Sequence, residues 1–166
     1  MTNFNPVKNI LVTGATGFIG VKLIESLEKL NVDIFVAGRN EIQLKHVFSQ
    51  HPFVTYDDLD FFPEKIDAVV HLAVMNNNST ANQEAFQNAN VDLFKKILNF
   101  CKSNNVPRLV NLSSFHIYNN KLDPYSTTKR EAYRLSKEHH FPLITNIICP
   151  LIYSSPFRGK LSLLNK

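Results

Sequence analysis

The sequence is poor in cysteine: it has two in 166 residues, Cys101 and Cys149. They lie far apart, each inside an apolar run. This pattern matches neither a disulfide framework nor the paired spacing of a zinc site, so both of those classes are excluded. We expect both thiols to be reduced core residues.

Long apolar runs are also missing. No segment approaches the roughly 18 consecutive apolar residues that a membrane span needs. The opening segment Met1–Lys8 lacks the basic region followed by an apolar region of a secretory leader. We therefore expect no membrane partner and a cytoplasmic location.

A strong charge of one sign is absent as well. Eighteen Lys and Arg against fourteen Asp and Glu give a net charge of +4, without a basic stripe in which aromatic residues are interleaved. Such a balance argues against nucleic acid as a partner, and against the chain being a nucleic-acid or scaffold protein.

Apolar residues are plentiful. They form 44% of the chain, with thirteen phenylalanines, which is enough to offset chain entropy and exclude a disordered polymer. The length suits one core, so we predict a single domain over residues 1–166.

Short β-branched runs alternate with longer segments of helical spacing, which is typical of βαβ units. This pattern predicts an α/β fold with a doubly wound parallel sheet in three αβα layers, and a strand order of 3-2-1-4-5-6. The predicted strands are Asn9–Thr13, Val32–Ala37, Phe53–Tyr56, Asp67–Leu72, Arg108–Ser113 and Leu143–Cys149.

Four helices are expected between these strands. The first follows the first strand and ends at Asn31, and the second is capped by Asn40 and runs to about Ser49. A long helix should cover Gln83–Ser103, and a last one Pro124 to about His139, with proline in its first turn.

Three glycines stand between the first strand and the first helix, in Val12-Thr-Gly-Ala-Thr-Gly-Phe-Ile-Gly20. Gly14 permits a tight turn, Gly17 lets the backbone approach a pyrophosphate, and Gly20 lets helix and strand pack closely. The N–H groups at the helix N-terminus can bind phosphate. A G-x-x-G-x-x-G spacing alone can be an ordinary flexible turn, but in this context it predicts dinucleotide binding.

The end of the second strand distinguishes the two nicotinamide dinucleotides, because an acidic residue there binds a ribose 2′-hydroxyl and a cation binds a 2′-phosphate. This sequence has Gly38-Arg39. An arginine can grip phosphate with two hydrogen bonds, so NADP(H) is favoured over NAD(H), although an exposed loop arginine would look the same.

Tyr125 and Lys129 are four residues apart on a predicted helix, so their side chains share one face. A nearby ammonium, together with a positively charged oxidised nicotinamide, would lower the phenol pKa toward working pH, and Tyr125 could then serve as general acid and base. Ser114, at the end of the fifth strand, can donate a hydrogen bond to the substrate oxygen.

Together these motifs resemble the extended branch of the short-chain dehydrogenase/reductase superfamily, which contains the NAD(P)-dependent epimerases and dehydratases. The resemblance rests on Thr13-Gly-Ala-Thr-Gly-Phe-Ile-Gly20, Asp67-Ala-Val-Val-His-Leu-Ala73, Asn90-Val-Asp-Leu-Phe-Lys-Lys-Ile-Leu98, Arg108-Leu-Val-Asn-Leu-Ser-Ser114 and Tyr125-Ser-Thr-Thr-Lys129.

The resemblance implies a Rossmann cofactor domain and a catalytic triad of Ser114, Tyr125 and Lys129. It selects Ser114 over Ser113, because the family places its catalytic hydroxyl four residues before a tyrosine, here Tyr118. Asp58 and Leu59 resemble the family's Asp-Leu pair beside the adenine, although Asp57 can take that role. The implied cofactor-binding residues are Gly14, Thr16, Gly17, Phe18, Ile19, Gly20, Arg39, Asp58, Leu59, Leu72, Ala73, Asn90 and Lys129.

Histidines at three places in the chain are candidate site residues. The resemblance places His71 in the fourth strand, buried beside the glycine loop. His116 can face the substrate or stand in an exposed loop, and His139-His140 closes a helix without a third ligand for zinc. We expect no metal site.

Two departures from the family pattern bear on function. The segment between Tyr118 and Tyr125 is shorter than in the extended branch, and the chain stops where the family begins its substrate-binding C-terminal domain, which we therefore expect to be absent or truncated. The resemblance implies an NADP(H)-dependent oxidoreductase, epimerase or dehydratase that acts on a nucleotide-sugar or a related carbonyl or hydroxyl compound. The alternative is a non-catalytic NADP(H)-binding regulatory module.

The superfamily commonly dimerises through the helices that correspond to Gln83–Ser103 and Pro124–His139. Phe86, Phe94 and Phe100 add aromatic surface to the first of them. We therefore predict a homodimer formed through these two helices.

Overall fold

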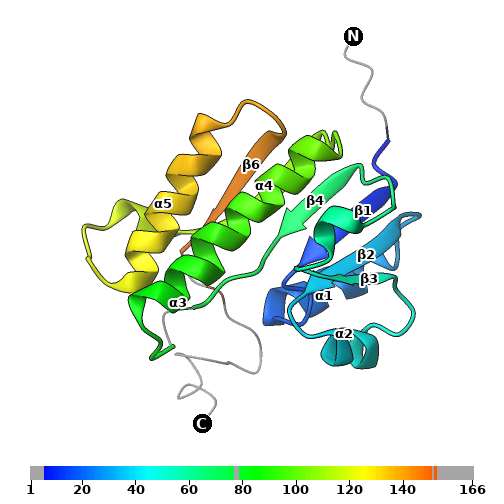
Figure 1. The fold of residues 1–166 in the computed structure, drawn as a ribbon, viewed down its shortest axis with the longest axis horizontal. Helices are drawn as coiled ribbons and strands as arrows, with labels where there is room; N and C mark the ends of the chain where they lie inside the picture. Colours follow the sequence, from blue (N-terminus) through cyan, green and yellow to red (C-terminus); the bar gives the residue numbers. More distant parts are fainter. Residues whose placement is uncertain (1–5, 77–78, 151, 153–166) are drawn as a thin grey trace.

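The computed structural model describes residues 6–76, 79–150 and 152. Figure 1 shows a sheet with helices packed along it. All six strands run parallel in the order β3-β2-β1-β4-β5-β6, which confirms the predicted topology. The strands are β1 Asn9–Thr13, β2 Asp33–Gly38, β3 Phe53–Thr55, β4 Ala68–His71, β5 Arg108–Ser114 and β6 Leu143–Cys149.

Alternate side chains of the strands enter two separate cores. Leu11 of β1 faces a core shared with Phe94, Ile97 and Phe100 of the later helices. Ile10 and Val12 of the same strand face the opposite core, which contains Ile24 and Leu44 of the earlier helices. Both faces of the sheet are therefore covered, and the predicted three-layer arrangement is confirmed.

Helices α2 and α5 begin at the residues where the sequence predicts their starts. Asn40 caps α2 (Glu41–Val47) by accepting a hydrogen bond from Gln43 N, and Asp123 caps α5 (Pro124–Glu138) by accepting one from Ser126 N. The first helix, α1, runs from Phe18 to Leu27 and so stops one turn before the predicted end at Asn31.

The predicted single helix over Gln83–Ser103 is divided. It consists of α3 (Gln83–Gln87), a π-helical turn η2 (Asn88–Asp92) and α4 (Leu93–Ser103). A π turn inserts one residue into the helical repeat, and such turns are frequent at functional sites. Here it brings Asn90 and Val91 inward, both buried.

The prediction that three phenylalanines add surface for dimerisation is wrong. Phe86, Phe94 and Phe100 are all buried within this chain, at 3%, 0% and 0% exposure, because α3 and α4 pack them against the chain's own core. Figure 1 shows α4 and α5 side by side along one face of the sheet. Self-association through these helices stays a prediction, now without its aromatic surface.

Across the described ranges, no helix combines the length and the hydropathy needed to cross a membrane.

Two short 3-10 helices complete the fold at the carboxyl edge of the sheet. These are η1 (Leu59–Phe61), after β3, and η3 (Phe115–Tyr118), directly after β5.

Candidate active site

The glycine loop after β1 touches the end of β4. Gly14 has a φ of +70°, and a Cβ added to it would lie 2.6 Å from the Ala73 backbone nitrogen. A Cβ on Gly20 would overlap the carbonyl oxygen of Gly14. Both positions therefore require glycine, one for its φ and its close approach and the other for helix packing.

The N-terminus of α1 is open. Its N-cap is Gly17, whose own N–H donates to Gly14 O at 3.0 Å; no side chain caps the helix, and its first turn holds no acidic residue. A Cβ on Gly17 would meet only Gly14 O, at 3.2 Å. Thr16 and Phe18 are exposed and Ile19 is half-buried. This geometry fits an anionic diphosphate, which would accept hydrogen bonds from the free N–H groups.

Arg39 lies exposed directly after β2, on the same edge as the glycine loop. Tyr56, which the sequence analysis did not single out, packs beside it at the end of β3. Burial raises the pKa of the Tyr56 phenol, whereas a hydrogen bond with Gly14 backbone, the charge of Arg39 and a hydrogen bond with Thr13 lower it. Tyr56 thus joins the glycine loop to the predicted 2′-phosphate position.

Three further predicted cofactor residues are at least partly exposed, and a fourth lies in the core. Asp58 is exposed and accepts a hydrogen bond from Thr55 Oγ1 at 2.5 Å. Leu72 and Ala73 border Gly14 and are half-buried. Leu59 is fully buried in the core, so its side chain is not available to a ligand.

Ser114, Tyr125 and Lys129 meet at the carboxyl edge of β5. Ser114 ends β5, and Tyr125 and Lys129 lie in the first two turns of α5. A hydrogen bond links the Ser114 side chain with the Tyr125 phenol, and Lys129 Nζ donates to the Leu112 carbonyl at 3.1 Å. The structure therefore brings Ser114 and Tyr125 together and places Lys129 Nζ against β5, at the residue two positions before Ser114.

Burial dominates the electrostatics of Tyr125 and Lys129. Burial raises the pKa of the Tyr125 phenol, the hydrogen bond from Ser114 lowers it, and the charge of Asp123 raises it again. Burial lowers the pKa of Lys129 to about 8. The groups that change the pKa of Tyr125 do not include Lys129. The expected lowering of the phenol pKa by the Lys129 ammonium together with an oxidised nicotinamide stays a prediction.

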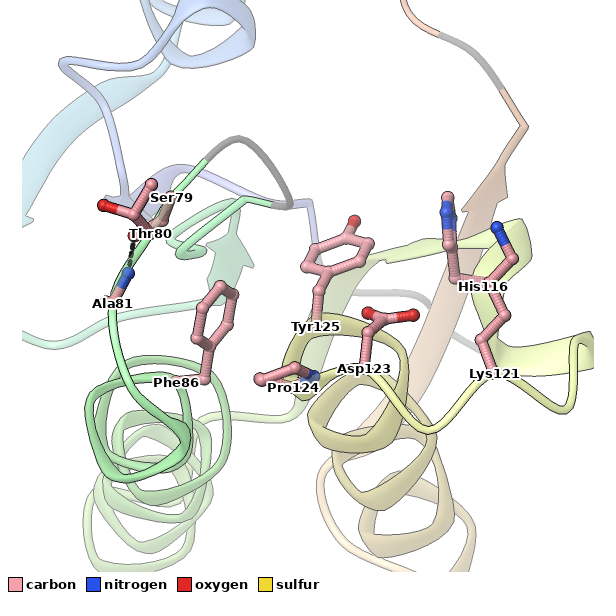
Figure 2. A pocket seen from close by; sticks show the side chains of 9 residues that line it. All are labelled: Ser79, Thr80, Ala81, Phe86, His116, Lys121, Asp123, Pro124 and Tyr125. Atoms are coloured by element: carbon pink, nitrogen blue, oxygen red, sulfur yellow. Dashed lines mark hydrogen bonds between the residues drawn. The ribbon is translucent and has the colours of Figure 1, made fainter.

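A pocket of about 350 Å³ opens beside the triad. Figure 2 shows Tyr125 in its middle, with Phe86 on one side and Asp123, His116 and Lys121 on the other. Ser79, Thr80, Ala81 and Pro124 complete the lining. The pocket thus combines an apolar wall with hydroxyl, imidazole, ammonium and carboxylate groups around the phenol.

His116, which the sequence left between two interpretations, belongs to this site. Its Nδ1 lies 2.9 Å from Ser114 Oγ, and its ring meets the Tyr125 ring edge to face at 5.1 Å between centroids. Asp123 is a second residue that the sequence analysis missed. The Asp-Pro pair at the start of a predicted helix was a capping signal that could have identified it.

The short loop that carries Lys121 is clamped from α5. One guanidinium nitrogen of Arg130 donates to the Asn119 carbonyl and the other to the Lys121 carbonyl, each at 2.7 Å. Arg130 thereby fixes the backbone of the segment that closes one side of the pocket.

Asn90 acts from inside the π turn. Its side chain accepts a hydrogen bond from Met75 N at 2.7 Å and donates to Met75 O and to Thr128 Oγ1, each at 3.1 Å. Its amide is thus engaged with the loop after β4 and with α5. It ties the loop after β4 to α5, and both of its N–H donors are engaged within the protein.

His71 is buried as predicted, and its Nδ1 lies 2.8 Å from Thr13 Oγ1. Burial and the charge of Lys129 lower its pKa to about 3. In the part of the chain that the structure covers, no group of three or more His, Cys, Asp or Glu could hold a metal ion.

The chain is similar to known proteins in both sequence and structure. The model of the NAD dependent epimerase/dehydratase family matches residues 10–147. ADP-L-glycero-D-manno-heptose-6-epimerase of Brachyspira hyodysenteriae is 26% identical over 153 residues, which cover 82% of this chain and 48% of that protein. The chain spans about half the length of this relative.

Two solved structures share the fold. The structure of Pen from Bacillus thuringiensis matches with a TM-score of 0.74 at 22% identity, over 97% of this chain and 55% of that one. UDP-glucuronic acid 4-epimerase from Bacillus cereus, in complex with NAD, matches with a TM-score of 0.69 at 24% identity, over 86% and 56%. The family match covers most of the sheet and both sides of the site, and so the chain belongs to the NAD dependent epimerase/dehydratase family.

Proposed function

We propose that this chain binds NADP(H) and supplies the proton-transfer groups of an oxidoreductase, epimerase or dehydratase that acts on a nucleotide-sugar. The observation that carries the proposal is the meeting of Ser114, Tyr125 and buried Lys129 at the same sheet edge as the open glycine loop. A phosphate site and a phenol with a hydrogen-bonded hydroxyl are the two parts that such chemistry needs.

Each residue has a defined part in the proposed reaction. Tyr125 Oη takes the proton from a substrate hydroxyl, or returns it to a carbonyl oxygen, and Ser114 donates a hydrogen bond to that oxygen. Lys129 stays near Leu112 O and adds positive charge beneath the site. When bound, the nicotinamide would accept or return a hydride at the carbon that bears this oxygen.

The substrate class follows from the relatives. They include ADP-L-glycero-D-manno-heptose-6-epimerase and UDP-glucuronic acid 4-epimerase. The polar pocket beside Tyr125 suits a sugar, since Ser79, His116 and Lys121 can all hydrogen-bond with hydroxyl groups.

NADP(H) is proposed over NAD(H) because of Arg39. No carboxylate within the described ranges forms an ion pair with its guanidinium, which lies exposed at the end of β2 beside Tyr56. A free guanidinium at this position can bind a 2′-phosphate with two charged hydrogen bonds.

Isothermal calorimetry on the 166-residue chain tests the cofactor assignment. Arg39→Ala should weaken NADP(H) by about 1.5–3 kcal/mol, the worth of charged hydrogen bonds, and leave NAD(H) nearly unchanged. Arg134→Ala is the matched control, because this arginine pairs with Glu138 on the far turns of α5. If the native chain binds NAD(H) more tightly than NADP(H), the assignment fails.

A non-catalytic NADP(H)-binding module is the second candidate, and the raised pKa of Tyr125 favours it. Conversion of a nucleotide-sugar by the chain in the presence of NADP(H), abolished by Tyr125→Phe, would exclude this candidate, because phenylalanine keeps the ring and cannot exchange a proton. Turnover that survives the substitution would remove the acid/base role of Tyr125.

A further inference from the structure

The Ser114 hydroxyl carries one proton, but two neighbours compete for it. One is the Tyr125 phenol, to which Ser114 is hydrogen-bonded. The other is Nδ1 of His116, which lies 2.9 Å from Ser114 Oγ. Ser114 Oγ also accepts a hydrogen bond from the backbone N–H of His116 at 3.3 Å, so its place in the structure is fixed at the cap of η3.

Which neighbour receives the proton depends on the imidazole. A neutral imidazole whose Nδ1 carries no hydrogen accepts from Ser114, and the proton is then withheld from Tyr125. An imidazolium carries hydrogen on both nitrogens, so Nδ1 must donate to Ser114 Oγ, and the serine proton is free to point to the phenol. Histidines ordinarily change charge between about pH 5 and 8.

We propose that His116 is a positioning residue that sets the direction of the Ser114 proton, withholding it from Tyr125 when neutral and releasing it to Tyr125 and the substrate oxygen when protonated. The inference deepens the proposed function and rests on it for its catalytic meaning. It adds a proton-direction switch to the triad, built from a residue two positions after the serine.

The surroundings of His116 are suited to such a switch. The groups that face it are the carboxylate of Asp123, the ammonium of Lys121, the Tyr125 ring and Ser114. The positive charge of His116 is among the causes that lower the pKa of Asp123, so the imidazolium and this carboxylate interact.

The direct test is nitrogen-15 NMR of the histidine rings in the native chain, with His116 assigned by its loss in His116→Phe. The proposal requires that neutral His116 carries its hydrogen on Nε2, leaving Nδ1 as acceptor. Ser114→Ala should then shift the Nδ1 resonance of the neutral ring, because its hydrogen-bond donor is gone. Neutral His116 with its hydrogen on Nδ1 would overturn the proposal.

A second measurement follows the proton to Tyr125, using carbon-13 in the tyrosine rings and Tyr125→Phe for assignment. In alkaline solution His116→Phe keeps a ring beside Tyr125 but frees Ser114 to donate to the phenolate. We expect the ionisation constant of Tyr125 to rise about fivefold, the effect of one hydrogen bond. In the Ser114→Ala background the same change should have no such effect, and an equal effect there would contradict the proposal.

Both measurements need neither dinucleotide nor substrate. If calorimetry shows no NADP(H) binding while the Nδ1 and Tyr125 signals behave as expected, the proposed function fails and the switch stands. If NADP(H) binds and neutral His116 carries its hydrogen on Nδ1, the switch alone fails.

Discussion

The half of the sheet formed by β1 to β3 and the half formed by β4 to β6 build the site in different ways. The first half offers a bare glycine loop, an uncapped helix N-terminus and one exposed arginine. Of the ten buried polar or charged side chains in the described residues, all but Thr13 lie in the second half. The first half therefore offers backbone N–H groups and one exposed cation, whereas the second half holds most of the buried polar and charged side chains.

The strongest test of this contrast is acid unfolding at His71. Its pKa is about 3 in the folded protein and 6.5 unfolded, so the unfolded chain takes up the proton first and stability falls as pH drops below 6.5. The loss reaches about 4–5 kcal/mol near pH 3. The double variant His71→Phe, Thr13→Val should lack this loss of stability in urea titrations between pH 6.5 and 3.5. The second substitution removes the Thr13 hydroxyl, which would otherwise be left without its His71 partner. His139→Leu, on the surface, should leave it unchanged.

Lys129 provides the alkaline counterpart. Its pKa is about 8 in the folded protein and 10.5 unfolded, so between these values the unfolded chain holds the proton more tightly and stability rises with pH. The free energy of unfolding of the native chain, minus that of Lys129→Met, should increase by about 3 kcal/mol from pH 8 to 10.5. A difference that stays flat would mean that the ammonium is solvated. Lys137→Met, near the end of α5, is the control.

In the first half, a methyl group added to either Gly14 or Gly17 tests the glycine loop. Gly14→Ala should cost about 2–3 kcal/mol, because its φ is positive and its Cβ meets the Ala73 backbone. Gly17→Ala should cost under about 1 kcal/mol, since only Gly14 O lies near. It should weaken NADP(H) instead, because the methyl group occupies the open side of the loop. Equal losses of stability in both variants, measured by urea unfolding, would contradict the assignment of Gly14 to the fold and Gly17 to cofactor binding.

The smallest expected difference concerns the helix caps. Asp123 accepts hydrogen bonds from both the N–H and the hydroxyl of Ser126, whereas Asn40 accepts one from Gln43 N. Asp123→Ala should cost about 1–2 kcal/mol and Asn40→Ala about 0.5–1 kcal/mol in thermal unfolding. Asp123→Asn, which keeps an acceptor, should recover most of the loss. If Asn40→Ala costs more, the second half does not depend on its polar side chains as described.

The sequence predicts the first half of the site better than the second, for a physical reason. Glycine spacing and the residue that ends a strand are local properties, so Gly14, Gly20 and Arg39 stand where their pattern puts them. The strand order also follows, because alternating βαβ units permit few topologies.

What the sequence could not show depends on contacts between distant elements. The π turn exists where Asn90 bonds Met75 and Thr128, which helical periodicity does not encode. The pKa of Tyr125 in the free protein is raised mainly by burial, which only the packed fold determines. His116 reaches Ser114 because η3 turns directly after β5, a bend the sequence left open.

The Arg130 clamp has a consequence for how tightly a substrate can bind. Fixing one residue's backbone costs about 1–2 kcal/mol of conformational entropy. Because Arg130 holds Asn119 and Lys121 by their carbonyls, this cost is met when the chain folds, and a sugar that contacts Lys121 need not order the loop again. If the proposed sugar binds there, the segment between η3 and α5 is a rim that is already ordered before binding.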